Sequence, residues 1–151
     1  MPNLNRTTWF LFADSAKARL YESRGFLKGW TLVQEMNSDD ARKPDRELRT
    51  SPPTRGRKIG SGGRYGVSEA SEHEQAGEAF VTGVARFLNE AAAAAKFDQL
   101  VVSAPGRALS TLRRYLRHEA TEKYIAVWDK DLTNMTETDL FDYCRERLDR
   151  W

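Results

Sequence analysis

Residues 97–116 read FDQLVVSAPGRALSTLRRYL, and this stretch decides how the chain folds. Residues 98–104 (DQLVVSA) are continuous and apolar through the middle, which predicts an interior β-strand. Pro105 and Gly106 end that strand, and a helical spacing of apolar residues follows. Those residues are Ala108, Leu109, Leu112 and Leu116. A second strand is predicted at Tyr124–Trp128 (YIAVW), so strand, helix and strand require a parallel pair joined by a right-handed crossover.

Three further strands are predicted before this unit. Residues 7–14 (TTWFLFAD) are rich in β-branched and aromatic residues, and we expect this strand to be buried on both faces. Residues 18–23 (ARLYES) alternate polar and apolar positions, and residues 30–36 (WTLVQEM) form the third strand. Short turns at residues 14–15 and 25–29 join the three, which predicts an antiparallel meander.

Helices complete the predicted fold. Polar residues 68–71 provide N-caps for a long amphipathic helix that ends near Lys96. Thr136, with Asp139 three residues later, gives a start like a capping box for a last helix, and Cys144 lies on the apolar stripe of that helix. We therefore predict an α/β fold with a mixed sheet of about five strands in the order β-β-β-loop-α-β-α-β-α, with helices packed on it.

Length and composition restrict the class of protein. A chain of 151 residues is expected to form one domain, residues 1–151. The single cysteine, Cys144, excludes an internal disulfide and fits a reducing compartment. The apolar run near the start stops at Asp14, which is too short for a secretory signal or a membrane span. We expect a cytoplasmic protein with no membrane insertion.

The segment from about residue 37 to 67 differs from the rest in composition. It holds three prolines, five glycines and few apolar residues, so burial cannot offset the entropy lost on ordering. Between residues 42 and 64, eight cations face two anions, and 8 − 2 gives a local charge of +6. The cations are Arg42, Lys43, Arg46, Arg49, Arg55, Arg57, Lys58 and Arg64. The segment is predicted to be a flexible basic loop.

Two motifs resemble known families. FADSAKARLYES (residues 12–23) resembles the start of the middle domain of archaeal and eukaryotic peptide-chain release factors. FDQLVVSAPGRALSTLRRYL and the later IAVWDKDLTNMTETDL are similar to the bacterial family of proteins required for attachment to host cells. That resemblance spans residues 7–148 and implies a ribonuclease H-like fold. In release factors the loop before the long helix carries Gly-Gly-Gln, whereas this chain has Gly62-Gly63-Arg64.

The basic residues give the preferred functional hypothesis, a non-enzymatic binding module. Arginine and lysine can neutralise phosphates, glycines let the backbone follow an irregular RNA surface, and a tyrosine can stack on a base. The predicted nucleic-acid-binding residues are Arg55, Arg57, Lys58, Gly62, Gly63, Arg64 and Tyr65 in the loop, with Arg113, Arg114 and Arg117 on the second helix. RNA or the ribosome is the partner that the release-factor resemblance implies. The alternatives are a solvated insertion, or a protein-interaction adaptor.

An enzyme is the second hypothesis, either a metal-dependent nuclease or a peptidyl-tRNA hydrolase. Asp14 ends the first strand, and Glu74 with Asp129 or Asp131 could share a divalent metal with it; the alternative is that Asp14 is a turn residue. The missing glutamine argues against peptide release, because arginine only donates hydrogen bonds.

The remaining candidates have simpler interpretations. His73, His118 and Cys144 lack zinc-ligand spacing, so surface histidines and a core cysteine are expected. Residues 103–107 could bind an anion at a helix start, but a strand exit followed by a helix start is the preferred interpretation. We therefore expect no cofactor and no dedicated small-molecule site.

Overall fold

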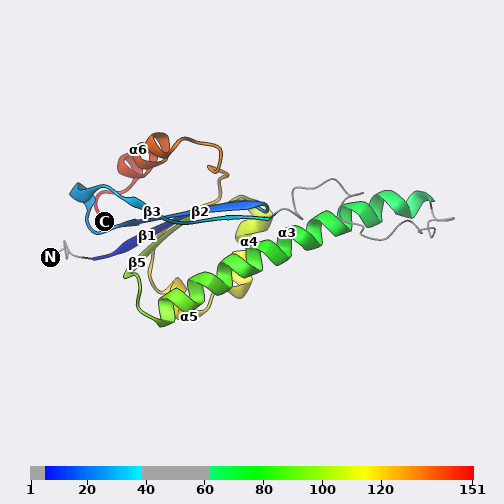
Figure 1. The fold of residues 1–151 in the computed structure, drawn as a ribbon, viewed down its shortest axis with the longest axis horizontal. Coiled ribbons are helices and arrows are strands. Elements are labelled where there is room, and N and C mark those ends of the chain that lie inside the picture. Colours follow the sequence, from blue (N-terminus) through cyan, green and yellow to red (C-terminus); the bar gives the residue numbers. More distant parts are fainter. Residues whose placement is uncertain (1–5, 39–61) are drawn as a thin grey trace.

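The computed structural model describes the backbone of residues 6–38 and 62–151, and the side chains of residues 6–38 and 72–151. Five strands form one sheet in the order β3-β2-β1-β5-β6 (Figure 1). The strands are β1 (Thr8–Ala13), β2 (Lys17–Ser23), β3 (Thr31–Asn37), β5 (Gln99–Ser103) and β6 (Tyr124–Trp128). β1, β2 and β3 pair antiparallel, whereas β1, β5 and β6 are parallel. The predicted α/β class with a mixed sheet is confirmed.

Helices cover both faces of this sheet. α3 (Gly62–Ala93), α4 (Gly106–Tyr115) and the short α5 (His118–Thr121) lie on one face, and α6 (Glu137–Arg147) lies on the other (Figure 1). A 3-10 turn, η1 (Phe26–Lys28), connects β2 to β3. The N-terminal half of α3 extends well past the end of the sheet (Figure 1). Among its described side chains, burial begins at Gly77.

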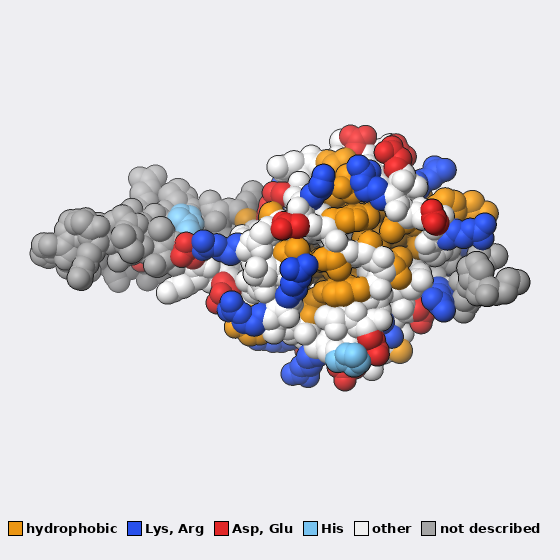
Figure 2. Space-filling model, turned by 180° about the vertical axis from the view of Figure 1, so that it is seen from behind, with side chains coloured by type: hydrophobic (Ala, Val, Ile, Leu, Met, Phe, Trp, Pro, Cys, Tyr) orange, Lys and Arg blue, Asp and Glu red, His pale blue; other side chains and the backbone are white. Residues whose placement is uncertain are grey.

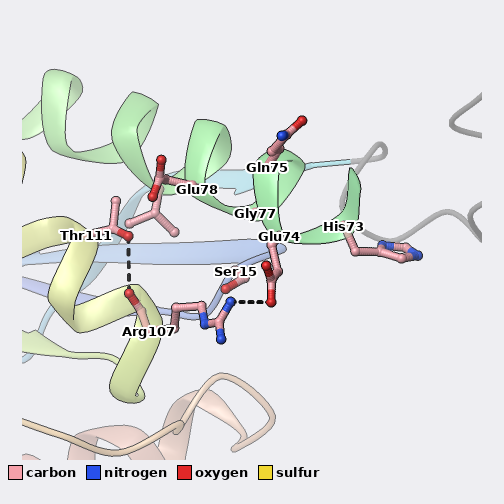
Figure 3. A pocket seen from close by; sticks show the side chains of 9 residues that line it. Ser15, His73, Glu74, Gln75, Gly77, Glu78, Arg107 and Thr111 are labelled. Atoms are coloured by element: carbon pink, nitrogen blue, oxygen red, sulfur yellow. Dashed lines mark hydrogen bonds and ion pairs between the residues drawn. The ribbon is translucent and has the colours of Figure 1, made fainter. Parts of the chain in front are cut away.

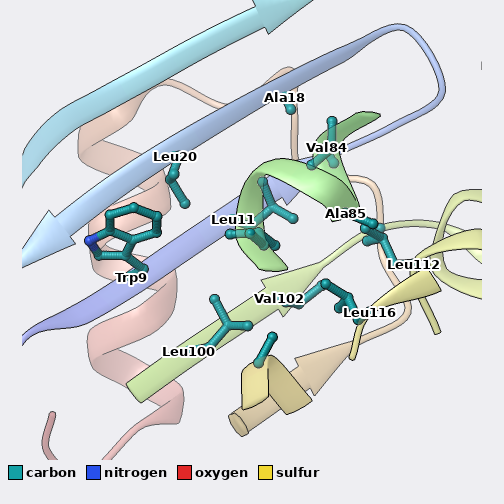
Figure 4. Packing of buried hydrophobic residues seen from close by; sticks show 14 of the residues in the cluster. Trp9, Leu11, Ala18, Leu20, Val84, Ala85, Leu100, Val102, Leu112 and Leu116 are labelled. Carbon is teal, nitrogen blue, oxygen red and sulfur yellow. The ribbon is translucent and has the colours of Figure 1, made fainter. Parts of the chain in front are cut away.

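The two faces of β1 bury different side chains. We call the side under α3 and α4 the α3 face; its core is largely aliphatic and joins Leu11 and Leu20 of the sheet to Val84, Leu88 and Leu112 of the helices (Figure 4). We call the other side the α6 face; it is built mainly from aromatic rings. Those rings belong to Phe10, Phe12, Tyr21, Trp30, Phe141 and Trp151. All six residues of β1 are buried, as its composition predicts.

Two helix boundaries differ from the sequence-based predictions. α3 begins at Gly62, so residues 62–67 are helical and do not belong to the predicted loop of about residues 37–67. Extending an existing helix avoids the cost of nucleation, which helps to offset the helix penalty of about 1 kcal/mol for each glycine. The second predicted helix ends at Tyr115, and Leu116 and Arg117 take extended backbone angles before α5. The predicted cap of α6 is confirmed, because the Asp139 N–H donates to Thr136 Oγ1 at 3.1 Å.

Candidate nucleic-acid interface

The basic side chains of α4 point away from the core because of the helical period. Ala108, Leu109, Thr111 and Leu112 are the residues of α4 that are buried against the α3 face. Arg113, Arg114 and Arg117 are exposed, as the sequence predicted for a polar helix face. The three arginines therefore lie on the solvent-exposed side of α4 and of the turn into α5, and we call this set the arginine surface.

Ion pairs separate the arginines into two groups. Arg107 Nη1 lies 2.6 Å from Glu74 Oε2, and Arg114 Nη1 lies 3.5 Å from Glu78 Oε2, so two successive turns of α3 hold two arginines of α4. Arg113 and Arg117 have no ion pair with any described residue. These two guanidinium groups keep their charge available to an external anion.

An exposed tyrosine adjoins these arginines. Tyr115 is 41% exposed, and the Arg114 guanidinium carbon lies 5.9 Å from the centre of its ring. Asn89 of α3 fixes the turn that presents it: Asn89 Nδ2 donates to the Tyr115 carbonyl at 2.9 Å, and the Arg117 N–H donates to Asn89 Oδ1 at 2.8 Å. Neither residue was predicted to contribute. Tyr115 could have been found, because it lies off the apolar stripe at positions 108, 109, 112 and 116.

A polar cleft of about 540 Å³ lies between α3, the start of α4 and the β1–β2 turn (Figure 3). Its lining includes Ser15, His73, Glu78 and Thr111, and the pair between Arg107 and Glu74 crosses it (Figure 3). This cleft was not predicted from the sequence. α3 and the β1–β2 turn approach closely at two of its lining residues, because a Cβ on Gly77 would lie 3.0 Å from Ser15 Cβ.

The carboxylates proposed for a nuclease are only partly brought together. Asp14 Oδ1 accepts the N–H groups of Ala16 and Lys17 at 2.7 and 2.8 Å, which is the geometry of a turn residue. The Thr133 hydroxyl lies 3.1 Å from Asp14 Oδ2 and 2.6 Å from Asp131 Oδ1, so these two carboxylates share a contact.

The other two carboxylates of that hypothesis lie apart from this contact. Glu74 is paired with Arg107, and Asp129 is exposed. Among the described residues, no group of three or more acidic, histidine or cysteine side chains is arranged to hold a metal.

The histidines and the cysteine have ordinary surroundings. His118 is 84% exposed and lies 3.3 Å from Glu122. Burial raises the pKa of the Cys144 thiol to about 12, with Arg147 opposing the shift, so this thiol is a poor nucleophile near neutral pH. The strand exit at 103–107 has a structural explanation, because Ser103 Oγ donates to the Lys130 carbonyl at 2.8 Å.

Comparison with known proteins identifies the family. A family model described as "Protein required for attachment to host cells" matches residues 9–143. The chain belongs to this family. The resemblance to host-attachment proteins that the sequence motifs suggested is thereby confirmed.

Two solved structures are similar to this host-attachment family member. The archaeal translation termination factor aRF1 has 12% sequence identity and a TM-score of 0.49, over 94% of this chain and 39% of that one. A structure described as "Archaeal protein" has 14% identity and a TM-score of 0.43, over 89% of this chain and 33% of that one. The chain thus spans less than half of either structure. A comparison with curated proteins gave no match.

The structure describes only some of the loop residues that were predicted to bind nucleic acid in this host-attachment family member. Arg55, Arg57 and Lys58 lie outside the described residues. Gly62, Gly63, Arg64 and Tyr65 form the first turn of α3, where the backbone alone is described. Within the described ranges, no helix is both long and apolar enough to cross a lipid bilayer.

Proposed function

We propose that this host-attachment family member is a non-enzymatic binding module for RNA, whether free or exposed on the ribosome. The observation that carries the proposal is the arginine surface. Arg113 and Arg117 are exposed and have no ion pair with a described residue, and the guanidinium carbon of the intervening Arg114 lies 5.9 Å from the ring centre of the partly exposed Tyr115.

The chemistry of this surface suits a flexible polyanion. A guanidinium group offers a planar fork of donors that matches two phosphate oxygens, and it stays charged at any physiological pH. An exposed tyrosine ring can stack on an unpaired base whatever its identity. Asn89 holds the turn between α4 and α5, so both groups are presented on a rigid part of the chain. Arg55, Arg57, Lys58 and Arg64 would add cationic charge to the same partner.

Catalysis is not part of the proposal. The sequence has Arg64 where the release-factor motif has glutamine, so peptide release by that motif is not expected. Asp14 is engaged by two backbone N–H groups and Glu74 by Arg107, so neither is free to act as the nuclease hypothesis requires.

A binding assay with a fluorescent single-stranded RNA of about 12 nucleotides tests the proposal, since this length fits within the usual site size of about 4–16 nucleotides. We expect wild type to bind, and Arg113→Gln with Arg117→Gln to weaken binding by at least about tenfold, because two phosphate contacts are removed. Arg24→Gln is the control: Arg24 is 71% exposed but lies on the β2–η1 turn. Equal binding by the double variant and wild type, or cleavage of the RNA by wild type, would contradict the proposal.

A further inference from the structure

β6 is an edge strand with the composition of an interior strand. Its five residues, YIAVW, include no charge and no proline, and all five are only partly buried. Natural proteins usually protect a sheet edge with charges, prolines, irregular strands or covering elements. The opposite edge, β3, carries Gln34 and Glu35. Among the described residues, the protection seen at β6 is an irregularity at Ile125, which has no partner in β5.

The apolar side chains of β6 continue onto α6. Trp128 packs edge-to-face on Tyr143, with ring centres 5.2 Å apart. Figure 2 shows hydrophobic side chains gathered in the middle of the rear face and bordered by charged ones, on the side of the sheet where β6 is the outer strand. Such a rimmed apolar patch is typical of a protein–protein contact.

The two ends of β6 carry charges that complement each other. Lys123 precedes the strand, and the exposed Asp129 follows it. In an antiparallel pair about a two-fold axis, the beginning of each strand lies beside the end of the other. With the axis at Ala126, Lys123 lies near the second copy's Asp129, and Glu122 lies near the second copy's Lys130. Both contacts are attractive, so the strand is complementary to itself in this orientation.

A buried hydroxyl at the same strand also lacks a partner. Tyr124 Oη is buried and accepts or donates no hydrogen bond to a described residue. A buried polar group without a partner is costly, and most such groups are satisfied by protein or water. Because this hydroxyl has almost no accessible surface in the single chain, it does not reach a second copy, and the pairing of β6 does not depend on it.

We propose that two copies of this chain associate through β6, antiparallel and about a two-fold axis near Ala126. The two five-stranded sheets then join into one, with α3 and α4 of both copies on the same face. The two arginine surfaces consequently lie on the same side of the dimer. The proposal rests on the edge strand and its charges, and it stands whether or not the arginine surface binds RNA.

Sedimentation measurements on the full chain over a range of concentrations test the proposal. Wild type is expected to dimerise. Lys123→Glu or Asp129→Lys alone should raise the dimer dissociation constant by about tenfold, because each change makes two symmetric contacts repulsive. The double variant K123E/D129K should restore the wild-type constant, because it exchanges the charges and keeps them complementary. Lys28→Glu, an exposed change on η1, is the control.

Each outcome of this experiment decides for or against the proposal. Loss in both single variants and recovery in the double variant supports pairing through β6. The proposal would be overturned if the wild-type chain stays monomeric, or if neither single change alters the dimer dissociation constant. It would also be overturned if the double variant dimerises more weakly than either single variant. Thermal unfolding of each variant confirms that the surface changes leave the fold intact.

Discussion

On the α3 face of the sheet, the buried core is mostly aliphatic, with Trp9 stacked on Phe97, whereas on the α6 face the core is built mainly from aromatic rings. Val84, Ala85 and Leu88 of α3 are buried against the strands on the first face. On the second face, Trp30 stacks on Tyr21 with ring centres 4.3 Å apart and meets Phe141 edge-on at 5.0 Å.

The two faces of the sheet also differ in the charged side chains that their helices expose to solvent. Small side chains let the backbones of α3 and the β1–β2 turn approach closely at Gly77. α4 buries Ala108, Leu109, Thr111 and Leu112 and exposes Arg113 and Arg114, so the arginine surface lies on this face. On the α6 face, α6 covers large aromatic rings. The same face holds Trp151, whose Nε1 donates to Ser23 Oγ at 2.8 Å. The α3 face is therefore the side on which we expect function.

The largest effect is expected from removing a ring on the α6 face. Phe10 is fully buried and meets Trp30 and Trp151 edge-on, each with ring centres 5.1 Å apart. Phe10→Ala should lower the free energy of unfolding by about 3–5 kcal/mol, measured by urea denaturation. Phe80→Ala, a partly buried change on α3, is the control and should cost clearly less. Equal losses would show that the two faces do not differ as described.

A smaller effect separates two glycines of α3. A Cβ on Gly77 would meet Ser15, whereas a Cβ on Gly83 would meet nothing within 4 Å. Gly77→Ala should destabilise the chain by about 1–3 kcal/mol, because the close approach is overpacked. Gly83→Ala should stabilise it by up to about 1 kcal/mol, because alanine favours a helix more than glycine does. Thermal unfolding of both variants measures the contrast, and two changes of the same sign would refute it.

The smallest effect depends on pH and concerns the α6 face. Burial raises the pKa of Cys144 from 9.0 to about 12, so the folded chain holds the proton at pH values where the unfolded chain releases it. The thiol's contribution to stability is thus complete below pH 9 and is lost as pH rises from 9 towards 12. Between pH 8 and 10, wild type should lose about 1 kcal/mol more stability than Cys144→Ala. Parallel pH profiles for the two proteins would contradict the burial of the thiol.

Much of the fold could be predicted from periodicity. The strand at Tyr124–Trp128 has the predicted bounds, and the other four differ by at most one residue at each end. Local chemistry also predicted the cap at Thr136. The predicted start of α3, with N-caps at residues 68–71, lies at least six residues after the observed start at Gly62. Glycine disfavours a helix, but residues that extend an existing helix do not meet the cost of nucleation.

The candidate site was predicted less completely, because it depends on contacts between distant residues. The helix period indicated that Arg113, Arg114 and Arg117 face outward, and the structure agrees. No local pattern indicated that Glu78 would pair with Arg114, or that Asn89 would hold the turn after α4. Both contacts arise from the packing of α3 on α4, which a single sequence does not specify.

Local sequence patterns also did not predict the complete aromatic cluster on the α6 face. The sequence did not indicate that the last residue, Trp151, joins the rings of the α6 face, since its partners Phe10, Ser23 and Phe26 lie more than 100 positions away. Three of the loop candidates, Arg55, Arg57 and Lys58, lie outside the described residues, and their role remains a prediction from composition alone.

The most direct test of the arginine surface is the salt dependence of RNA binding. The logarithm of the affinity for a single strand falls with the logarithm of salt concentration, with a slope of about −0.7 for each phosphate contact. Replacing Arg113 and Arg117 together by glutamine should therefore make the slope shallower by about 1.4, with Arg24→Gln leaving it unchanged. The same slope for the double variant and wild type would show that this surface does not meet phosphates.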